Sequence, residues 1–241
     1  MNSTSRSAPA GGAFDVIIVG GGVLGTALAR ELAGRGRRVL LLERGRVAGE
    51  ASGVAAGMLN PQAEADAPSA FFDFGLANRT IYADWVAAVS AEAALPIEYR
   101  SLPLLYLAPD EPAAAALHAR AAWQAARGLR AEWLTAAQAR TREPILAPDL
   151  AGALLLPSEA LVDAQALTIA LAAAARRRGA EILEDQPVTG LLIEDGRLVG
   201  VLAGGTAHRA PTVVIATGAW GSAFSDLPLP TDWIAPVRGQ L

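Results

Sequence analysis

The chain has 241 residues, a formal net charge of −4, two histidines (His118 and His208) and no cysteine. The lack of cysteine excludes disulfides, thiolate metal sites and a cysteine nucleophile, and two histidines are too few for a histidine metal cluster, so we expect no metal. The mild negative charge argues against a nucleic-acid partner bound through bulk positive charge. No apolar run approaches the roughly 20 residues that a membrane-spanning helix needs, so we expect no membrane span and take the cytoplasm as the default location.

Residues 1–13 are small and polar, and we expect them to form a disordered lead-in. Phe14 to Glu43 then has the pattern of one βαβ unit: an apolar strand (F-D-V-I-I-V), a glycine turn (G-G-G-V-L-G), a helix, and a second apolar strand that ends in an acid. The helix carries Leu24, Leu28 and Leu32 on one face. A glycine turn alone is a weak signal, but these parts in register indicate a dinucleotide-binding unit.

Three glycines of this turn have a physical reason. Gly20 makes the tight turn, Gly22 lacks a Cβ that would hold the backbone away from a pyrophosphate, and Gly25 lets helix and strand pack closely. The helix N-terminus offers free N–H groups and a positive dipole end to phosphates. Glu43, about 20 residues further on, is placed to accept hydrogen bonds from a ribose.

The central part of the chain mixes helices and strands. Residues 44–61 are rich in Gly, Ala and Ser, as is typical of backbone that lies close to a flat group. A helix is expected over 71–93, with Ile81, Trp85 and Val89 at four-residue spacing. The next expected elements are a strand over 97–108 interrupted by Pro103, a helix over 111–127, a strand over 131–134, a helix from Thr135 and a strand over 153–156.

Another helix should begin after Asp163, a good capping residue, and end at the arginine triplet 176–178 beside Gly179. Basic side chains and a glycine are favourable at a helix C-terminus, so we interpret the triplet as a helix end rather than an anion site.

Turn signals then indicate an antiparallel meander. Asp195-Gly196 and Gly204-Gly205 separate three short strands, expected over 188–194, 197–202 and 206–209. A fully apolar strand over 212–216 follows and ends in a second glycine turn. Ligands bind at the carboxyl edge of open α/β sheets, so the two glycine turns could converge on one cofactor.

This order of elements resembles the FAD-binding fold of the glutathione-reductase type: an α/β, Rossmann-like parallel sheet with a β-meander, accompanied here by part of an α+β substrate domain. The resemblance becomes specific at G-E-A-S-G-V-A-A-G-M-L-N-P (49–61), which is similar to the flavin-loop motif of the glycine oxidases of the D-amino-acid oxidase and sarcosine oxidase superfamily. It extends to E-P-I-L-A-P-D-L-A-G-A-L-L-L-P-S-E-A-L-V-D, A-T-G-A-W and P-V-R-G-Q-L, and so covers nearly the whole chain from Asp15.

The resemblance implies FAD as the cofactor and gives each matching position a role. The backbone of Gly20, Gly22, Val23, Leu24 and Gly25 would hold the pyrophosphate. Glu43 and Arg44 would lie at the adenosine ribose and its surroundings, the backbone of Val188 would meet the adenine, and Ala51 and Ser52 would make a further cofactor contact. Ala56, Gly57 and Met58 would lie beside the isoalloxazine ring, and Thr217, Gly218 and Trp220 would close the site from the second half of the chain. For Met58 and Trp220, packing within the protein is the alternative.

The resemblance also implies a division into domains. The FAD-binding domain would comprise 14–94 and 152–225, and the partial substrate domain 95–151 and 226–241. The family places the arginine that binds the substrate carboxylate, the active-site tyrosine and a last glycine-rich segment beyond Leu241, so no catalytic residue is named. We therefore expect a fragment of a longer oxidase, or a chain whose missing part a separate chain supplies; a homo-oligomer is a further possible assembly.

The implied reaction is the oxidation of glycine or another small amino acid to an imine and then a 2-oxo acid, with oxygen reduced to hydrogen peroxide, in thiamine biosynthesis. Three alternatives stay open: a D-amino-acid dehydrogenase with a quinone acceptor, the oxidase-like domain of a tRNA-modifying enzyme, and a flavin-binding fragment without turnover.

Overall fold

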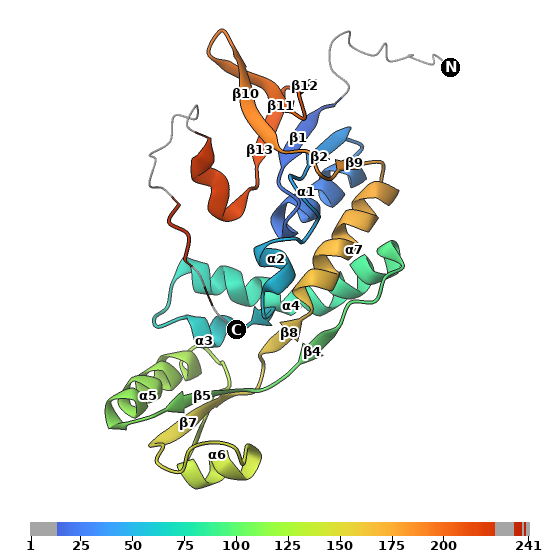
Figure 1. Ribbon diagram of the computed structural model, residues 1–241. Helices are drawn as coiled ribbons and strands as arrows, with labels where there is room; N and C mark the ends of the chain where they lie inside the picture. Colours follow the sequence, from blue (N-terminus) through green and yellow to red (C-terminus); the bar gives the residue numbers. More distant parts are fainter. Residues whose placement is uncertain (1–13, 225–233, 238, 240–241) are drawn as a thin grey trace. The chain divides into compact units, whose positions relative to one another are not determined.

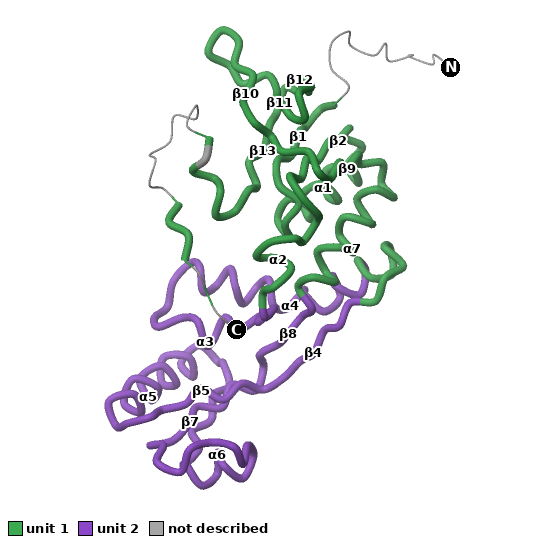
Figure 2. Tube along the Cα trace, viewed as in Figure 1, with its two compact units in different colours: residues 1–55, 89–96, 164–241 green, residues 56–88, 97–163 purple. Residues whose placement is uncertain are grey.

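The computed structural model describes residues 14–224, 234–237 and 239 (Figure 1). The lead-in expected over 1–13, and the greater part of 226–241, lie outside the described residues. The chain divides into two compact units (Figure 2): unit 1 comprises residues 1–55, 89–96 and 164–241, and unit 2 comprises 56–88 and 97–163. Unit 2 thus includes 56–88, which the sequence had grouped with the FAD-binding part. The assignment of a cofactor domain and a substrate domain stays a prediction.

Unit 1 is built on a parallel sheet with the strand order β13-β1-β2-β9. The strands are β1 (Val16–Val19), β2 (Val39–Leu42), β9 (Glu181–Leu183) and β13 (Thr212–Ile215). Strand β1 is flanked by β2 and β13, with Val16 opposite Val39 on one side and Thr212 on the other. Because parallel strands end at the same edge, the turns that follow β1 and β13 are neighbours.

Alternate residues of β1 and β2 point to opposite faces of this sheet and pack against different layers. One face lies against the helices α1 (Val23–Gly34) and α7 (Ala164–Arg177) through Val16, Ile18, Val39 and Leu41. The other face is covered by the meander β10 (Val188–Glu194), β11 (Arg197–Ala203) and β12 (Thr206–Arg209), which packs on Ile17, Val19, Leu40 and Leu42. The expected α/β fold, a parallel sheet with a β-meander, is confirmed.

The meander turns form where the sequence placed them. In both turns, Asp195-Gly196 and Gly204-Gly205, both residues have positive φ, at 50° and 72° in the first and 55° and 76° in the second. Two consecutive left-handed residues are the geometry of a type I′ hairpin turn, whose twist matches that of the flanking strands.

Unit 2 holds two small antiparallel sheets. One has the order β3-β8-β4, formed by Met58–Leu59, Ala160–Val162 and Tyr99–Ser101. The other has the order β5-β7-β6, formed by Leu104–Ala108, Gly152–Leu156 and Glu132–Leu134. In the central strand β7, Leu154 and Leu156 pack toward helix α5 (Glu111–Ala125), whereas Ala153 and Leu155 pack toward α6 (Ala136–Arg142).

The remaining helices are short or cross the unit boundary. They are α2 (Ala51–Val54), α3 (Pro61–Glu64), α4 (Ala70–Ala93) and the 3₁₀ helix η1 (Gly218–Ala223). Helix α4 matches the expected 71–93, but it buries Val86 and Val89 while Ile81 is exposed. Within the part of the chain that the structure describes, no helix is long and apolar enough to cross a membrane.

Helix α1 turns mainly small residues toward the sheet. Leu24 is 77% exposed, and the residues that face inward are Gly25, Ala29 and Ala33. The reason is close packing: a Cβ on Gly25 would lie 2.0 Å from the carbonyl oxygen of Gly20. Small side chains therefore face the sheet, and the larger Leu28 and Leu32 are only partly buried beside them.

A partly buried ion cluster in unit 1 accounts for the last residue of the arginine triplet. Glu92 binds Arg30, at 2.8 Å from its Nε, and also Arg178, the last residue of the triplet. The Arg30 side chain is only 7% exposed. Burial alone would raise the pKa of Glu92, but the hydrogen bonds and charges of Arg178 and Arg30 outweigh it and lower that pKa. Arg178 thus serves as an internal counter-charge.

We expect Gly25→Ala to lower the free energy of unfolding by about 3 kcal/mol, because its new methyl group would overlap the Gly20 carbonyl and α1 would have to move away from the sheet. Urea unfolding measures the change. Gly190→Ala is the matched control, since a Cβ at that position meets no atom within 4 Å. Equal stability of the two variants would contradict the close packing of α1.

We expect Glu92→Gln to lower the free energy of unfolding at pH 7 by about 3 kcal/mol, because the shape is kept while two arginines lose a counter-charge. The lowered pKa means that this stabilisation is present at neutral pH and disappears in acid, as the carboxylate becomes protonated. The difference between wild type and variant should therefore be constant above the ordinary pKa of 4.5 and shrink as the pH falls below it. Glu194→Gln, which removes an exposed partner of Arg209, should change little and is the control.

Candidate functional site

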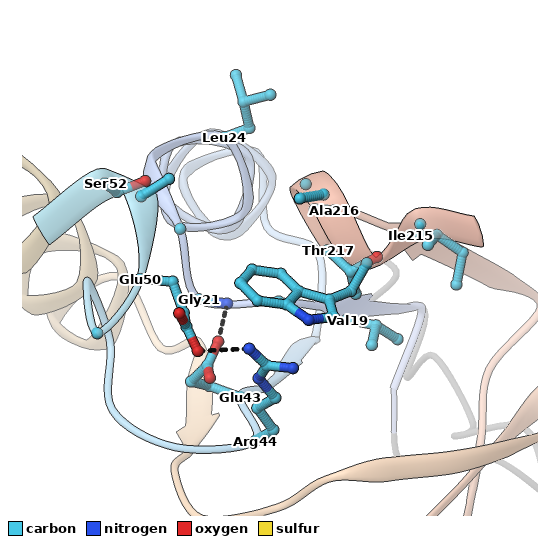
Figure 3. A pocket seen from close by; sticks show the side chains of 18 of the residues that line it. Val19, Gly21, Leu24, Glu43, Arg44, Glu50, Ser52, Ile215, Ala216 and Thr217 are labelled. Atoms are coloured by element: carbon cyan, nitrogen blue, oxygen red, sulfur yellow. Dashed lines mark hydrogen bonds and ion pairs between the residues drawn. The ribbon is translucent and has the colours of Figure 1, made fainter. Parts of the chain in front are cut away.

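A cavity of about 410 Å³ lies in unit 1 at the carboxyl edge of the parallel sheet (Figure 3). Both glycine turns contribute to it, one after β1 and one after β13. Its walls are formed by residues 19–24, 42–44, 46, 48–52, 186–188, 215–221, 224 and 234. It is thus built by segments that are far apart in the sequence and that β1 brings together.

The two turns touch through their backbones. Gly20 has a φ of +111°, and a Cβ there would lie 2.5 Å from the carbonyl oxygen of Ala216. Gly20 is therefore required both by its left-handed conformation and by the neighbouring strand. Gly22, in contrast, has an ordinary extended φ of −75°, and a Cβ there would meet only the hydroxyl of Ser52, at 3.1 Å.

Glu43 is fixed by two backbone N–H groups. Gly21 donates to Oε2 at 2.7 Å (dashed in Figure 3), and Gly45 donates to Oε1 at 2.9 Å. The residue is only 9% exposed and lines the cavity. A carboxylate has about four acceptor positions, so Glu43 can accept further hydrogen bonds from hydroxyl groups of a ligand.

Ser52 accepts a hydrogen bond at the N-terminus of α1, from the N–H of Val23 at 3.0 Å. Because the hydroxyl oxygen is the acceptor, its own hydrogen is available to a ligand in the cavity. The other first-turn N–H groups of α1 have no acceptor within the helix. This corner of the cavity therefore presents donors and the positive end of a helix dipole, which suits an anion.

Arg44 lines the cavity and connects two other segments of its wall, through Trp220 and Glu50. Its guanidinium carbon lies 3.9 Å from the centre of the Trp220 ring, and it forms an ion pair with Glu50 (dashed in Figure 3). Near it, the second turn has Gly218 at a φ of +55°. The buried Oγ1 of Thr217 has no hydrogen-bond partner in the described structure, so a polar group of a ligand could satisfy it.

Most of the predicted site residues line this one cavity: Gly20, Gly22, Val23, Leu24, Glu43, Arg44, Ala51, Ser52, Val188, Thr217, Gly218 and Trp220. Gly25 does not line it and instead packs beneath the first turn. Ala56, Gly57 and Met58 belong to unit 2 and are outside the lining residues. Met58 pairs with Leu161 through β3, and its side chain is 57% exposed rather than buried.

Several lining residues were not predicted. Gly21 was the middle glycine of G-G-G, and the bond from its N–H to Glu43 gives it a place in the site. Glu50 lies within the segment 49–61 that resembles the flavin loop but has no assigned role there, and Gln186 and Phe224 belong to no motif. The ion pair of Arg44 with Glu50 has one sequence signal, the opposite charges of two residues that are six positions apart.

Comparison with known proteins identifies the family. Residues 15–241 match the DAO family, described as FAD dependent oxidoreductase, and the chain belongs to this family. It is 34% identical over 228 residues to glycine oxidase of Geobacillus kaustophilus (strain HTA426), covering 94% of this chain and 60% of that protein. It is 36% identical over 236 residues to the bifunctional protein ThiO/ThiG of Nostoc sp. (strain PCC 7120), covering 94% of this chain and 33% of that protein.

The same similarity holds for the structure. The crystal structure of glycine oxidase from Geobacillus kaustophilus superposes with a TM-score of 0.83 at 34% identity, covering 88% of this chain and 57% of that one. The chain therefore has the FAD-binding fold of these enzymes, and it spans about 60% of the length of the glycine oxidase that it matches.

Proposed function

We propose that this chain is the FAD-binding part, with some of the substrate side, of an oxidase that acts on glycine or another small amino acid. The observation that carries the proposal is the convergence of two glycine turns on one cavity, with Glu43 held between Gly21 and Gly45. Membership of a family of FAD-dependent oxidoreductases supports FAD as the dinucleotide.

The residues of the cavity fit such a dinucleotide. The pyrophosphate would lie at the N-terminus of α1, against the backbone of Gly20 and Gly22 and the hydroxyl of Ser52. Glu43 would accept from the ribose hydroxyls, and Val188 would meet the adenine through its backbone. We extend the proposal to Ala56, Gly57 and Met58, which would lie along the isoalloxazine ring by their resemblance to the flavin loop.

When bound, FAD would accept two electrons from the substrate and pass them on to an electron acceptor. The protein's contribution is to hold the cofactor, orient it and keep its phosphates paired with donors. For the substrate we propose glycine or a similar amino acid, which would lose two electrons and two protons to become an imine and then hydrolyse. Oxygen as acceptor, with hydrogen peroxide as product, and a place in thiamine biosynthesis are supported by the names glycine oxidase and ThiO/ThiG among the relatives.

Gly22→Val is expected to lose FAD while keeping its fold. The position has an ordinary φ, so valine is tolerated by the backbone, but its side chain would occupy the path of the pyrophosphate. We expect FAD affinity to fall by at least about 100-fold, as for the loss of several charge-assisted hydrogen bonds. Flavin fluorescence on titration of the flavin-free protein measures it, and circular dichroism checks the fold.

Gly190→Ala again serves as the matched control, because it adds a Cβ elsewhere in unit 1 without a contact. It should bind FAD like the wild type. Full flavin occupancy in Gly22→Val would overturn the assignment of the first turn to the pyrophosphate.

The test of the whole proposal is spectroscopic. The purified chain should bind FAD and show a flavin absorption spectrum, and glycine, sarcosine or D-alanine added without oxygen should bleach it if the chain holds enough of the substrate site. Peroxide on readmission of air would identify an oxidase, whereas reoxidation by a quinone alone would identify a dehydrogenase. A bound flavin that no amino acid reduces would limit the function to cofactor binding, and a chain that binds no flavin would refute the proposal.

A further inference from the structure

A buried polar cluster lies in unit 2, and none of its residues lines the cavity. Glu159, in the turn before β8, has a side chain that is only 1% exposed, and it forms an ion pair with Arg79 of α4 at 3.2 Å. Its Oε1 also accepts from the backbone N–H of Gln62 in α3, at 3.3 Å. The side chain of Gln62 in turn accepts from Arg79 at 3.1 Å and donates to Gln124 of α5 at 3.0 Å.

Burying the carboxyl of Glu159 in this way destabilises the folded state. Its second oxygen, Oε2, is buried and has no hydrogen-bond partner among the described residues. Burial, with a smaller contribution from the charge of Glu64, raises the pKa of Glu159 to about 7, although Arg79 and the Gln62 N–H act to lower it. Arg79 and Glu64 are the charged groups that act on it, while α5 contributes the neutral Gln124. An apolar residue of similar size at this position would cost less free energy to bury, so the presence of a carboxyl needs an explanation.

The cluster holds one end of the segment 57–62. The other end of this segment is fixed by β8, the strand that directly follows Glu159: Val162 donates to the carbonyl of Gly57 at 3.0 Å, and Met58 and Leu59 pair with Leu161 and Ala160. The segment is thus held at both ends, at Gln62 by the side chain of Glu159 and at residues 57–59 by the strand that follows Glu159.

We propose that Glu159 is a positioning residue for the flavin loop, whose ionisation sets how firmly the segment 57–62, and with it Gly57 and Met58, is held. The link to the flavin rests on the proposed function, whereas the hold on the segment does not.

Linkage gives the direction of the effect. The closed cluster favours the protonated carboxyl, while a carboxyl released to water ionises at an ordinary pKa of 4.5. The closed state therefore binds more protons than the open state, and it becomes less favourable as the pH rises from 4.5 toward 7. One proton linked to opening corresponds to a change of about tenfold per pH unit. Above about pH 7 both states are ionised and the effect levels off.

The first experiment needs no flavin. Hydrogen exchange of peptides covering 57–62 is measured in the flavin-free chain from pH 5 to 8 and corrected for the intrinsic exchange rate. We expect protection to fall at least tenfold between pH 5 and 7 in the wild type and to stay constant in Glu159→Gln, which is neutral at every pH. Glu64→Gln should retain the fall but complete it at lower pH, because removal of that charge lowers the pKa of Glu159.

The second experiment uses the FAD-loaded chain. The visible flavin spectrum should change with pH, with a midpoint near 7 in the wild type, a lower midpoint in Glu64→Gln and no transition in Glu159→Gln. A purely structural role for Glu159 would lower stability without producing this titration.

The outcomes separate the two proposals. Protection of 57–62 that does not depend on pH in the wild type, or that changes equally in Glu159→Gln, overturns the positioning role. The expected exchange pattern in a chain that binds no flavin supports the hold on the segment and refutes the proposed function instead. A bound flavin whose spectrum is independent of pH overturns the link between Glu159 and the flavin.

Discussion

The structure of unit 1 depends on a backbone approach that leaves no room for a Cβ. Gly25 of α1 lies against the carbonyl of Gly20, and Gly20 lies against the carbonyl of Ala216. The helix, the first turn and the turn after β13 are therefore stacked directly on one another. This stacking requires β1 to pair in parallel with β13, a strand that comes after all of unit 2 in the sequence. The cavity exists because these distant segments meet at that point.

The sequence predicted those parts of the fold that have their own local signal. The βαβ unit, the meander and its two type I′ turns, and the apolar strand β13 each combine periodicity with glycine at a required position. Strands β3, β8 and β9, with two or three residues each, are too short for a period to show. The leucines of α1 do not identify its buried face, because leucine spacing records where apolar residues recur, whereas the contact distance to the sheet selects glycine and alanine.

The candidate site was predictable to a similar extent. Residues in a motif, such as Gly22 and Glu43, were found because the chemistry of dinucleotide binding fixes their spacing. The cation–π contact of Arg44 with Trp220 and the anchoring of Glu43 by Gly21 depend on tertiary placement. Glu159 carries no signal at all in the sequence: nothing in P-S-E-A-L-V-D distinguishes a buried carboxyl from a solvated one, and its partners are 80 and 97 residues away.

The two hydrogen bonds that hold the Glu43 carboxylate in place affect which nucleotides the proposed site would bind. With each carboxylate oxygen bound to a backbone N–H, the side chain cannot rotate aside, so a negative charge stays at the place where the ribose hydroxyls are expected. A ribose that carries a 2′-phosphate there would bring a second anion close to this carboxylate. In the proposed site, the same two hydrogen bonds that orient the acceptor would thus disfavour a dinucleotide with a 2′-phosphate, by electrostatic repulsion rather than by shape.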